Sequence, residues 1–202
     1  METKAVGRRK FLVLTWTDVE MLVDRLERLI TSDGYGVDTI VGVLRGGMVV
    51  ANLLSDLLGV REVYVVGCKS YSDTEREELK VYHDLELREL TGRKILLVDD
   101  VADTGATLEV AVNRVLKPRQ PDMVRTATLL VKPWSRIRPD YVVQSTDAWI
   151  VFPWERMETV KAVAKIFVEE YGLGEGVKQL AVMSRLDEKK IVEAVKNFYT
   201  MS

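Results

Sequence analysis

The chain has 202 residues, 47% hydrophobic and 30% charged, which is enough apolar material for one elaborated domain or one domain with an appendage. Its 29 basic and 31 acidic residues give a formal net charge of -2, so electrostatics offers no reason to expect nucleic acid or an anionic membrane as the main partner. The single cysteine excludes an internal disulfide, and no apolar run approaches membrane-spanning length, so we expect a cytoplasmic protein.

Apolar strand patterns and amphipathic helix patterns alternate along the chain. The predicted strands are residues 11–16, 39–44, 62–68, 94–98 and 124–131. Shorter strands at 141–143 and 149–152 are expected to form a small cap. Helices are predicted at 17–30, where Thr17 and Glu20 form a capping-box pattern, in a segment ending at Gly59, and at 108–116, before Lys117-Pro118. This alternation predicts an α/β fold with an open, mainly parallel sheet flanked by helices.

A glycine-containing turn, Arg45-Gly46-Gly47, connects the strand at 39–44 to the following helix. The glycines let the backbone approach an anion closely, and Arg45 supplies a permanent positive charge, so the turn suits a pyrophosphate. Taken alone, the same three residues fit an ordinary tight turn with a surface arginine better than a pyrophosphate site.

A polar and charge-rich segment covers residues 69–84 and begins with Lys69-Ser70-Tyr71. It is too polar to pack and too long for a simple hairpin, so we predict a mobile lid. The only histidine, His83, lies near its end. We expect a surface or strand-edge histidine there and not a catalyst.

The most informative segment follows the buried strand at 95–98. Asp99 and Asp100 end that strand, and a polar turn at 103–107 leads into the next helix, at the strand end where open α/β sheets bind ligands. Backbone N–H groups and hydroxyls at a helix start suit a phosphate monoester, whereas the two carboxylates can accept hydrogen bonds from a ribose diol and help hold hydrated Mg2+. The alternative is a strand end followed by a helix cap, which requires only one acid.

This segment resembles the signature of the type I phosphoribosyltransferases, enzymes that use 5-phosphoribosyl 1-pyrophosphate (PRPP). The resemblance implies the type I phosphoribosyltransferase-like fold, Mg2+ as cofactor at Asp99 and Asp100, and Asp103 as a catalytic group beside the purine. The residues that it assigns to PRPP are Arg45, Gly46, Gly47, Ser70, Tyr71, Asp99, Asp100, Asp103, Thr104, Gly105, Ala106 and Thr107. Asp99 and Asp100 are also assigned to the catalytic set.

Two later segments resemble the nucleobase hood of the 6-oxopurine subgroup, closest to the xanthine-guanine phosphoribosyltransferases. These are Lys132-Pro133-Trp134 and the stretch from Trp149 to Glu155. The resemblance implies that Asp103, Lys132, Trp149, Ile150 and Glu155 contact the purine. Lys132 can donate to the carbonyl oxygen at position 6, and Trp149 can stack on the ring. The nearest pattern has aspartate where this chain has Glu155, which leaves the choice between guanine and xanthine open.

From Met157 onward the pattern is wholly helical, which predicts a phosphoribosyltransferase domain with its hood at 10–156 and a C-terminal helical extension at 157–202. Gly172 can cap the first helix, and the glycines from Gly172 to Gly176 are expected to form a linker before a later helix begun at Asp187. A helix-turn-helix is the alternative for this tail, but its basic and acidic side chains balance, so we do not expect nucleic acid.

We therefore predict a purine phosphoribosyltransferase of purine salvage, with PRPP and a free guanine, xanthine or hypoxanthine as substrates. The resemblance also implies a homodimer or homotetramer. The rival interpretation from another class is a PRPP- or nucleotide-sensing regulator without transferase activity. Lys132 and Trp149 favour an enzyme, and they disfavour an orotate- or adenine-specific transferase.

Overall fold

The computed structural model describes residues 2–6, 9–73 and 76–200. The chain divides into two compact units, one formed by residues 20–146 and the other by residues 1–19 together with residues 147–202. Each unit has its own sheet. The predicted division into domains at 10–156 and 157–202 stays a prediction.

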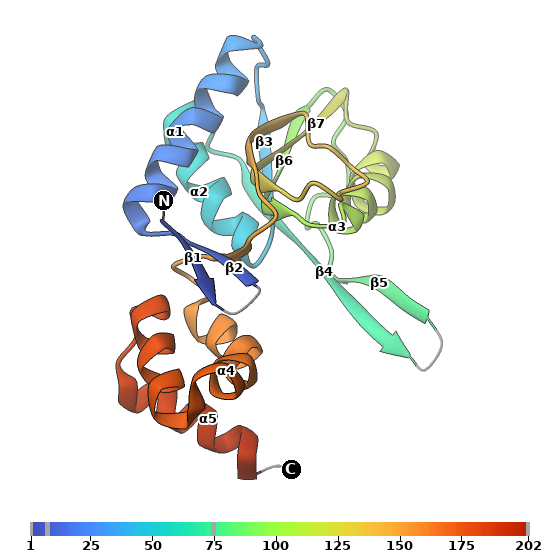
Figure 1. Ribbon diagram of the computed structural model, residues 1–202. Coiled ribbons are helices and arrows are strands. Elements are labelled where there is room, and N and C mark those ends of the chain that lie inside the picture. Colours follow the sequence, from blue (N-terminus) through green and yellow to red (C-terminus); the bar gives the residue numbers. More distant parts are fainter. Residues whose placement is uncertain (1, 7–8, 74–75, 201–202) are drawn as a thin grey trace. The chain divides into compact units, whose positions relative to one another are not determined.

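The larger unit is built on a six-stranded sheet with the order β5-β4-β3-β6-β7-β8 (Figure 1). Its strands are β3 (Thr39–Leu44), β4 (Val63–Asp73), β5 (Arg76–His83), β6 (Lys94–Ala102), β7 (Met123–Val131) and β8 (Tyr141–Ser145). All neighbouring pairs are parallel except β4 and β5. The central strands read as nearly continuous Val, Ile and Leu because both of their faces are buried. The predicted open, mainly parallel sheet is confirmed.

Helices cover both faces of this sheet (Figure 1). They are α1 (Trp16–Ser32), α2 (Gly46–Leu58) and α3 (Ala106–Val110), the last continued by a π-helical turn η1 (Ala111–Leu116) and a 3-10 turn η2 (Lys117–Arg119). Gly59 ends α2 with a φ of 67°, as predicted. The capping box of α1 was misplaced by two residues: Thr15 and Asp18 form it, with Thr15 N–H donating to Asp18 Oδ2 at 2.9 Å and Asp18 N–H donating to Thr15 Oγ1 at 3.1 Å.

Two local predictions were wrong: that the segment 69–84 is too long for a hairpin, and that the strand at 141–143 belongs to a small cap. The segment 69–84 belongs mostly to the antiparallel hairpin of β4 and β5, which satisfies its backbone hydrogen bonds without needing apolar side chains. The strand at 141–143 does not form a small cap, because it is β8, which pairs in parallel with β7 at the edge of the main sheet. His83 lies at the end of β5, opposite Gly67, in agreement with a strand-edge position.

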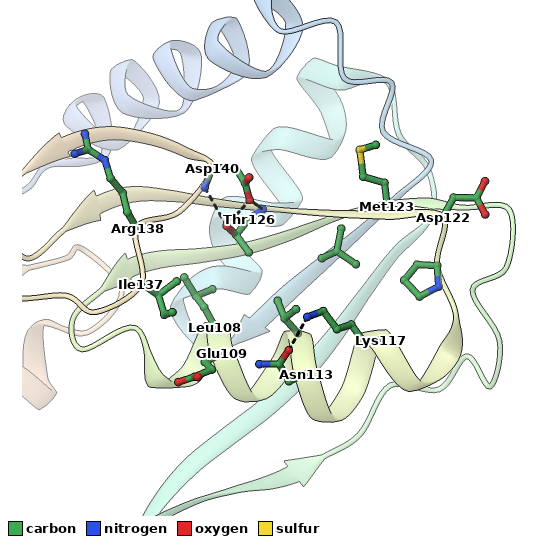
Figure 2. A pocket seen from close by; sticks show the side chains of 13 residues that line it. Leu108, Glu109, Asn113, Lys117, Asp122, Met123, Thr126, Ile137, Arg138 and Asp140 are labelled. Carbon is green, nitrogen blue, oxygen red and sulfur yellow. Dashed lines mark hydrogen bonds between the residues drawn. The ribbon is translucent and has the colours of Figure 1, made fainter.

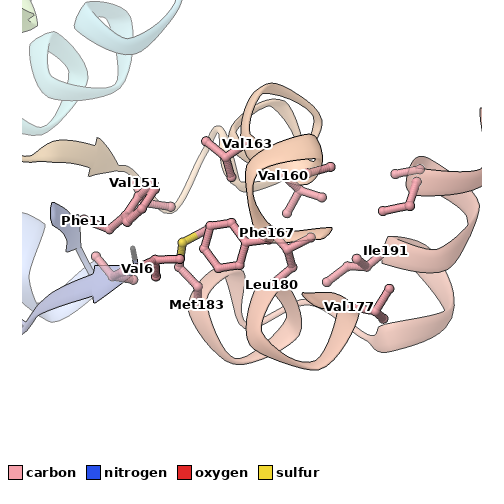
Figure 3. Packing of buried hydrophobic residues seen from close by; sticks show 14 residues of the cluster. Val6, Phe11, Val151, Val160, Val163, Phe167, Val177, Leu180, Met183 and Ile191 are labelled. Carbon is pink, nitrogen blue, oxygen red and sulfur yellow. The ribbon is translucent and has the colours of Figure 1, made fainter. Parts of the chain in front are cut away.

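The smaller unit combines a three-stranded sheet with helices. Its strands, in the order β1-β2-β9, are β1 (Glu2–Val6), β2 (Arg9–Val13) and β9 (Trp149–Val151). The helices are α4 (Arg156–Ser184) and α5 (Glu188–Thr200), and Figure 3 shows their buried side chains packed with those of the strands around Phe167. None of the helices in the described part of the chain is long and apolar enough to cross a membrane.

Gly172 interrupts α4 with φ 76° and ψ 165°, so the predicted end of the first tail helix is confirmed. The predicted linker from Gly172 to Gly176 was wrong, because the helix resumes immediately after Gly172. Gly176 is buried, and a Cβ there would lie only 2.8 Å from the carbonyl oxygen of Phe167. These glycines therefore serve a tight turn and a close helix contact.

Candidate active site

The site predicted for PRPP lies between β3 and β6, where the strand order of the sheet reverses direction. From β3 the chain continues to β4 on one side, whereas β6 and β7 follow on the other side. Neighbouring parallel strands β3 and β6 pair Gly42 with Val98, so the turns that follow their carboxyl ends meet at the same edge of the sheet. Ligands bind at this position in open α/β sheets. The peptide bond between Leu44 and Arg45, at the end of β3, is cis.

Gly46 and Gly47 are required by the close approach of the β6 carboxylates. A Cβ on Gly46 would collide with the carboxylate of Asp100, and a Cβ on Gly47 would lie 2.8 Å from the Cα and 3.0 Å from the Oδ1 of Asp99. Real Cβ contacts essentially never fall below 3.0 Å. The structure thus brings the turn at 45–47 and the pair Asp99–Asp100 together. Arg45 occupies the N-cap position of α2.

Asp99 and Asp100 form a crowded acidic pair. Asp100 is only 8% exposed, its N–H donates to Asp99 Oδ1 at 2.9 Å, and its own Oδ1 accepts from Val101 N–H at 2.8 Å. Burial, together with the neighbouring charge of Asp100, raises the pKa of Asp99 well above its ordinary value. A divalent cation beside the pair would offset this repulsion, and carboxylate oxygens are the ligands that Mg2+ prefers. The donor set therefore fits Mg2+.

Among the described residues, no group of three or more acidic, histidine or cysteine side chains is placed to hold a metal. Mg2+ is commonly held by one or two carboxylates together with substrate phosphates and water. A site completed by the substrate is consistent with the two carboxylates present here.

The turn at 103–107 carries the polar groups predicted for the 5'-phosphate. Asp103 and Thr104 are exposed, whereas Gly105 is buried and has a φ of 84°. Ala106 N–H donates to Thr104 Oγ1 at 3.3 Å, and the helical hydrogen bonds begin with Glu109 N–H donating to the carbonyl oxygen of Gly105 at 3.0 Å. Amide groups at the start of such a helix have no carbonyl partner within it, which makes them donors for an anion.

Lys132 and Asp103 lie on two consecutive loops that a tryptophan connects. The indole N–H of Trp134 donates to Asp103 Oδ1 at 2.7 Å, and the Lys132 ammonium lies 5.4 Å from the centroid of the Trp134 ring. Lys132 is 9% exposed and Trp134 is 55% exposed. Sequence reasoning assigned Lys132 but missed Trp134; an aromatic residue two positions after the lysine, in a turn containing proline, was the available signal.

The remaining predicted purine contacts belong to the smaller unit. Trp149 and Ile150 lie on β9, with Trp149 41% exposed and Ile150 buried, and Glu155 stands at the N-cap of α4. Trp154 stacks on Phe152 with a centroid distance of 4.6 Å, which accounts for it as a packing residue. Of the aromatic side chains in this segment, only that of Trp149 is exposed.

Ser70 and Tyr71, predicted for the lid, lie on β4 and pair through their backbones with Leu79 and Glu78 of β5. Their side chains lie outside the described part of the structure, so their role toward PRPP stays a prediction. The hairpin that carries them projects beyond the rest of its sheet (Figure 1).

A cavity of about 540 Å³ lies between α3–η1 and β7 (Figure 2). Its lining is mixed, with Leu108, Val112 and Ile137 beside Glu109 and Arg138. None of the predicted site residues contributes to this lining. A smaller pocket of about 270 Å³ includes Lys132, Pro133 and Ser135. Only the smaller pocket therefore involves a predicted site residue.

Comparisons with known proteins agree with this geometry. The phosphoribosyl transferase domain family matches residues 13–157. A xanthine-guanine phosphoribosyltransferase of Cereibacter sphaeroides is 37% identical over 131 residues, which cover 61% of this chain and 75% of that protein. The crystal structure of a purine phosphoribosyltransferase from Pyrococcus horikoshii Ot3 is 36% identical, with a TM-score of 0.66 over 71% of this chain and 93% of the other.

A structure of the Helicobacter pylori xanthine-guanine-hypoxanthine phosphoribosyltransferase shares the fold at 24% identity, with a TM-score of 0.67 over 75% of this chain and 99% of that chain. The family match covers both turns at the switch point, the acidic pair and Lys132, as well as the segment from Trp149 to Glu155. The chain belongs to the phosphoribosyl transferase domain family.

Proposed function

We propose that this protein transfers the 5-phosphoribosyl group of PRPP to N9 of a 6-oxopurine, giving a purine 5'-mononucleotide and pyrophosphate in purine salvage. The bond from N9 to the anomeric carbon forms while the bond from that carbon to the pyrophosphate oxygen breaks. The observation that carries the proposal is the meeting of the 45–47 turn with the acidic pair Asp99–Asp100 at the switch point.

Each part of PRPP has a chemically suitable partner. Arg45, with the backbone of Gly46 and Gly47, suits the pyrophosphate, and Asp99 with Asp100 suits the ribose hydroxyls. The 5'-phosphate fits the amides and hydroxyls of the segment 104–107. Ser70 and Tyr71 would cover the reacting sugar. Mg2+, when bound near the acidic pair, would neutralise charge on the leaving pyrophosphate.

For the purine, the proposal assigns Asp103 and Lys132 of the larger unit, and by family resemblance Trp149, Ile150 and Glu155 of the smaller unit. Lys132 donates to the oxygen at position 6, so adenine, which carries a donor there, would be disfavoured. Asp103, expected near purine N7, takes or shuttles a proton as N9 attacks, and Trp149 stacks on the ring. Ile150 offers backbone groups near position 2, and Glu155 bears on the choice between guanine and xanthine. Positioning and electrostatics would supply most of the catalysis, because the reacting sugar becomes positive between anionic groups.

The relatives named above are phosphoribosyltransferases, which favours the enzyme over a PRPP- or nucleotide-sensing regulator. A cytoplasmic location and a homodimer or homotetramer remain part of the proposal, and they rest on composition and family resemblance.

The test is an incubation of the protein with PRPP, Mg2+ and one base at a time: guanine, xanthine, hypoxanthine or adenine. We expect turnover of at least one 6-oxopurine, its loss after chelation of Mg2+, and a kcat about 10²-fold lower in Asp103→Asn. An Asp103→Asn variant with unchanged kcat would remove the proton-transfer role. PRPP binding without turnover of any base would favour the regulator.

A further inference from the structure

The turn after β7 is fixed against the turn after β6. Lys132 N–H donates to the carbonyl oxygen of Ala102 at 2.9 Å, and Arg136 N–H donates to that of Thr104 at 3.0 Å. Gly105 admits Ile137, since a Cβ on Gly105 would lie 2.6 Å from the Cβ of Ile137. This backbone framework delivers the intervening side chain, Trp134, to the acidic turn.

Trp134 is not held there by burial, because 55% of it is exposed. Its fixed contacts involve two groups that the proposed function assigns to the purine. The N–H of the indole donates to Asp103 Oδ1 at 2.7 Å, and the face of the ring lies 5.4 Å from the Lys132 ammonium. Both contacts are of a kind that fixes charged groups: a hydrogen bond to a carboxylate and a cation–π contact.

We propose that Trp134 is a positioning residue that holds Asp103 and Lys132 at a fixed spacing for the purine edge. This inference rests on the proposed function. N7 and O6 lie on the same edge of a 6-oxopurine, so their partners must keep one spacing, although they come from different loops. Without the indole, the exposed Asp103 carboxylate can rotate, and the Lys132 ammonium loses the aromatic face beside it. The indole N–H bonds Asp103 Oδ1, so Oδ2 is the carboxylate oxygen proposed to face the base.

A role for Trp134 as a competitor of the purine predicts a change in KM of the opposite sign. If the indole occupied the place of the purine, it would compete with the base, and its removal would lower the KM for the base. If it positions Asp103 and Lys132, its removal raises that KM and weakens the preference for a 6-oxo over a 6-amino purine. The sign of the change in KM therefore separates the two roles.

Two substitutions at Trp134 separate its hydrogen bond to Asp103 from its ring contact with Lys132. Trp134→Phe keeps a ring face for Lys132 but loses the N–H donor, whereas Trp134→Leu loses both. Tyr171→Leu, on α4 and 37% exposed, is the control for loss of an exposed aromatic ring. Steady-state kcat and KM are measured for guanine, hypoxanthine, xanthine and adenine at saturating PRPP. The Kd for PRPP and the melting temperature are measured in parallel to monitor folding.

For Trp134→Leu we expect the KM for the preferred 6-oxopurine to rise about 10-fold or more. The ratio of kcat/KM for that 6-oxopurine to kcat/KM for adenine should fall by about the same factor. The Kd for PRPP should stay within about 2-fold of wild type. Trp134→Phe should keep the base ratio but lower kcat. Its effect should disappear in an Asp103→Ala background, because Asp103→Ala removes the acceptor of the indole N–H.

A lower KM for the base in Trp134→Leu would overturn the inference, and so would parallel losses of PRPP and base binding. Additive effects of Trp134→Phe and Asp103→Ala would overturn it as well. An active wild type with an unchanged Trp134→Leu variant contradicts the positioning role alone. A wild type that turns over no purine contradicts the proposed function, and the positioning role with it.

Discussion

The substitution Gly46→Ala tests whether the turn after β3 and the acidic pair after β6 form one site. The new Cβ would occupy the place of the Asp100 carboxylate, so the carboxylate must move. Moving it breaks the 2.8 Å hydrogen bond from Val101 N–H to Asp100 Oδ1 and withdraws Asp100 from the ribose position. We expect a stability loss of about 1–3 kcal/mol from overpacking and an unsatisfied amide. The Kd for PRPP should rise about 10-fold or more, since a hydrogen bond to a charged group is lost.

Urea unfolding gives the stability change, and calorimetric titration with PRPP and Mg2+ gives the Kd. Gly36→Ala is the matched control, because a Cβ there meets nothing within 4 Å and its backbone needs no positive φ. It should change stability by no more than about 0.5 kcal/mol and leave the Kd unchanged. A Gly46→Ala variant that binds PRPP as tightly as the control would refute the argument that the two turns share the ligand.

Three further predictions concern stability. Thr128→Val should be neutral or stabilising in urea unfolding, because the buried Thr128 Oγ1 is without a hydrogen-bond partner in the described structure. Thr126→Val should cost about 1–3 kcal/mol, because it breaks the 2.8 Å hydrogen bond from Thr126 Oγ1 to Asp140. A larger loss for Thr128→Val than for Thr126→Val would contradict this argument. Burial and a hydrogen bond to Asp33 raise the pKa of Tyr141 to about 12. Because the pKa of Tyr141 in the folded state lies above the unfolded value near 10, the stability that wild type gains over Tyr141→Phe should be complete below pH 10 and shrink toward pH 12. Melting curves at several pH values measure this difference. A stability difference that is independent of pH would contradict the raised pKa. Phe167→Ala, at a fully buried site, should lower the free energy of unfolding by about 3–5 kcal/mol. Leu173→Ala, at an exposed site, should lower it by about 0.5 kcal/mol or less. Equal losses of stability would mean that the tail does not share the core in Figure 3.

Local patterns account for the parts of the fold that the sequence predicted. The strand ending at Val98 was recognisable because its apolar run stops at two carboxylates, and Gly59 was recognisable because a helix end requires its left-handed backbone. Gly172 follows the same logic inside α4. In each case the deciding interaction is made within a few residues along the chain.

The parts that the sequence missed depend on partners distant in the chain. The hairpin of β4 and β5 is stabilised by backbone pairing, which leaves little trace in a charge-rich sequence. The edge position of β8 follows from its pairing with β7, and β9 pairs with β2, more than a hundred residues away. Trp134 was named only as part of its turn, because its hydrogen bond to Asp103 depends on how two loops meet.

The most direct test of the account quantifies mononucleotide and pyrophosphate in the same reaction, with PRPP, Mg2+ and a single 6-oxopurine. The account predicts equal amounts of the two products with guanine, xanthine or hypoxanthine, and little of either with adenine or in Asp103→Asn. Binding of PRPP without formation of either product, whatever the base, would contradict the transferase.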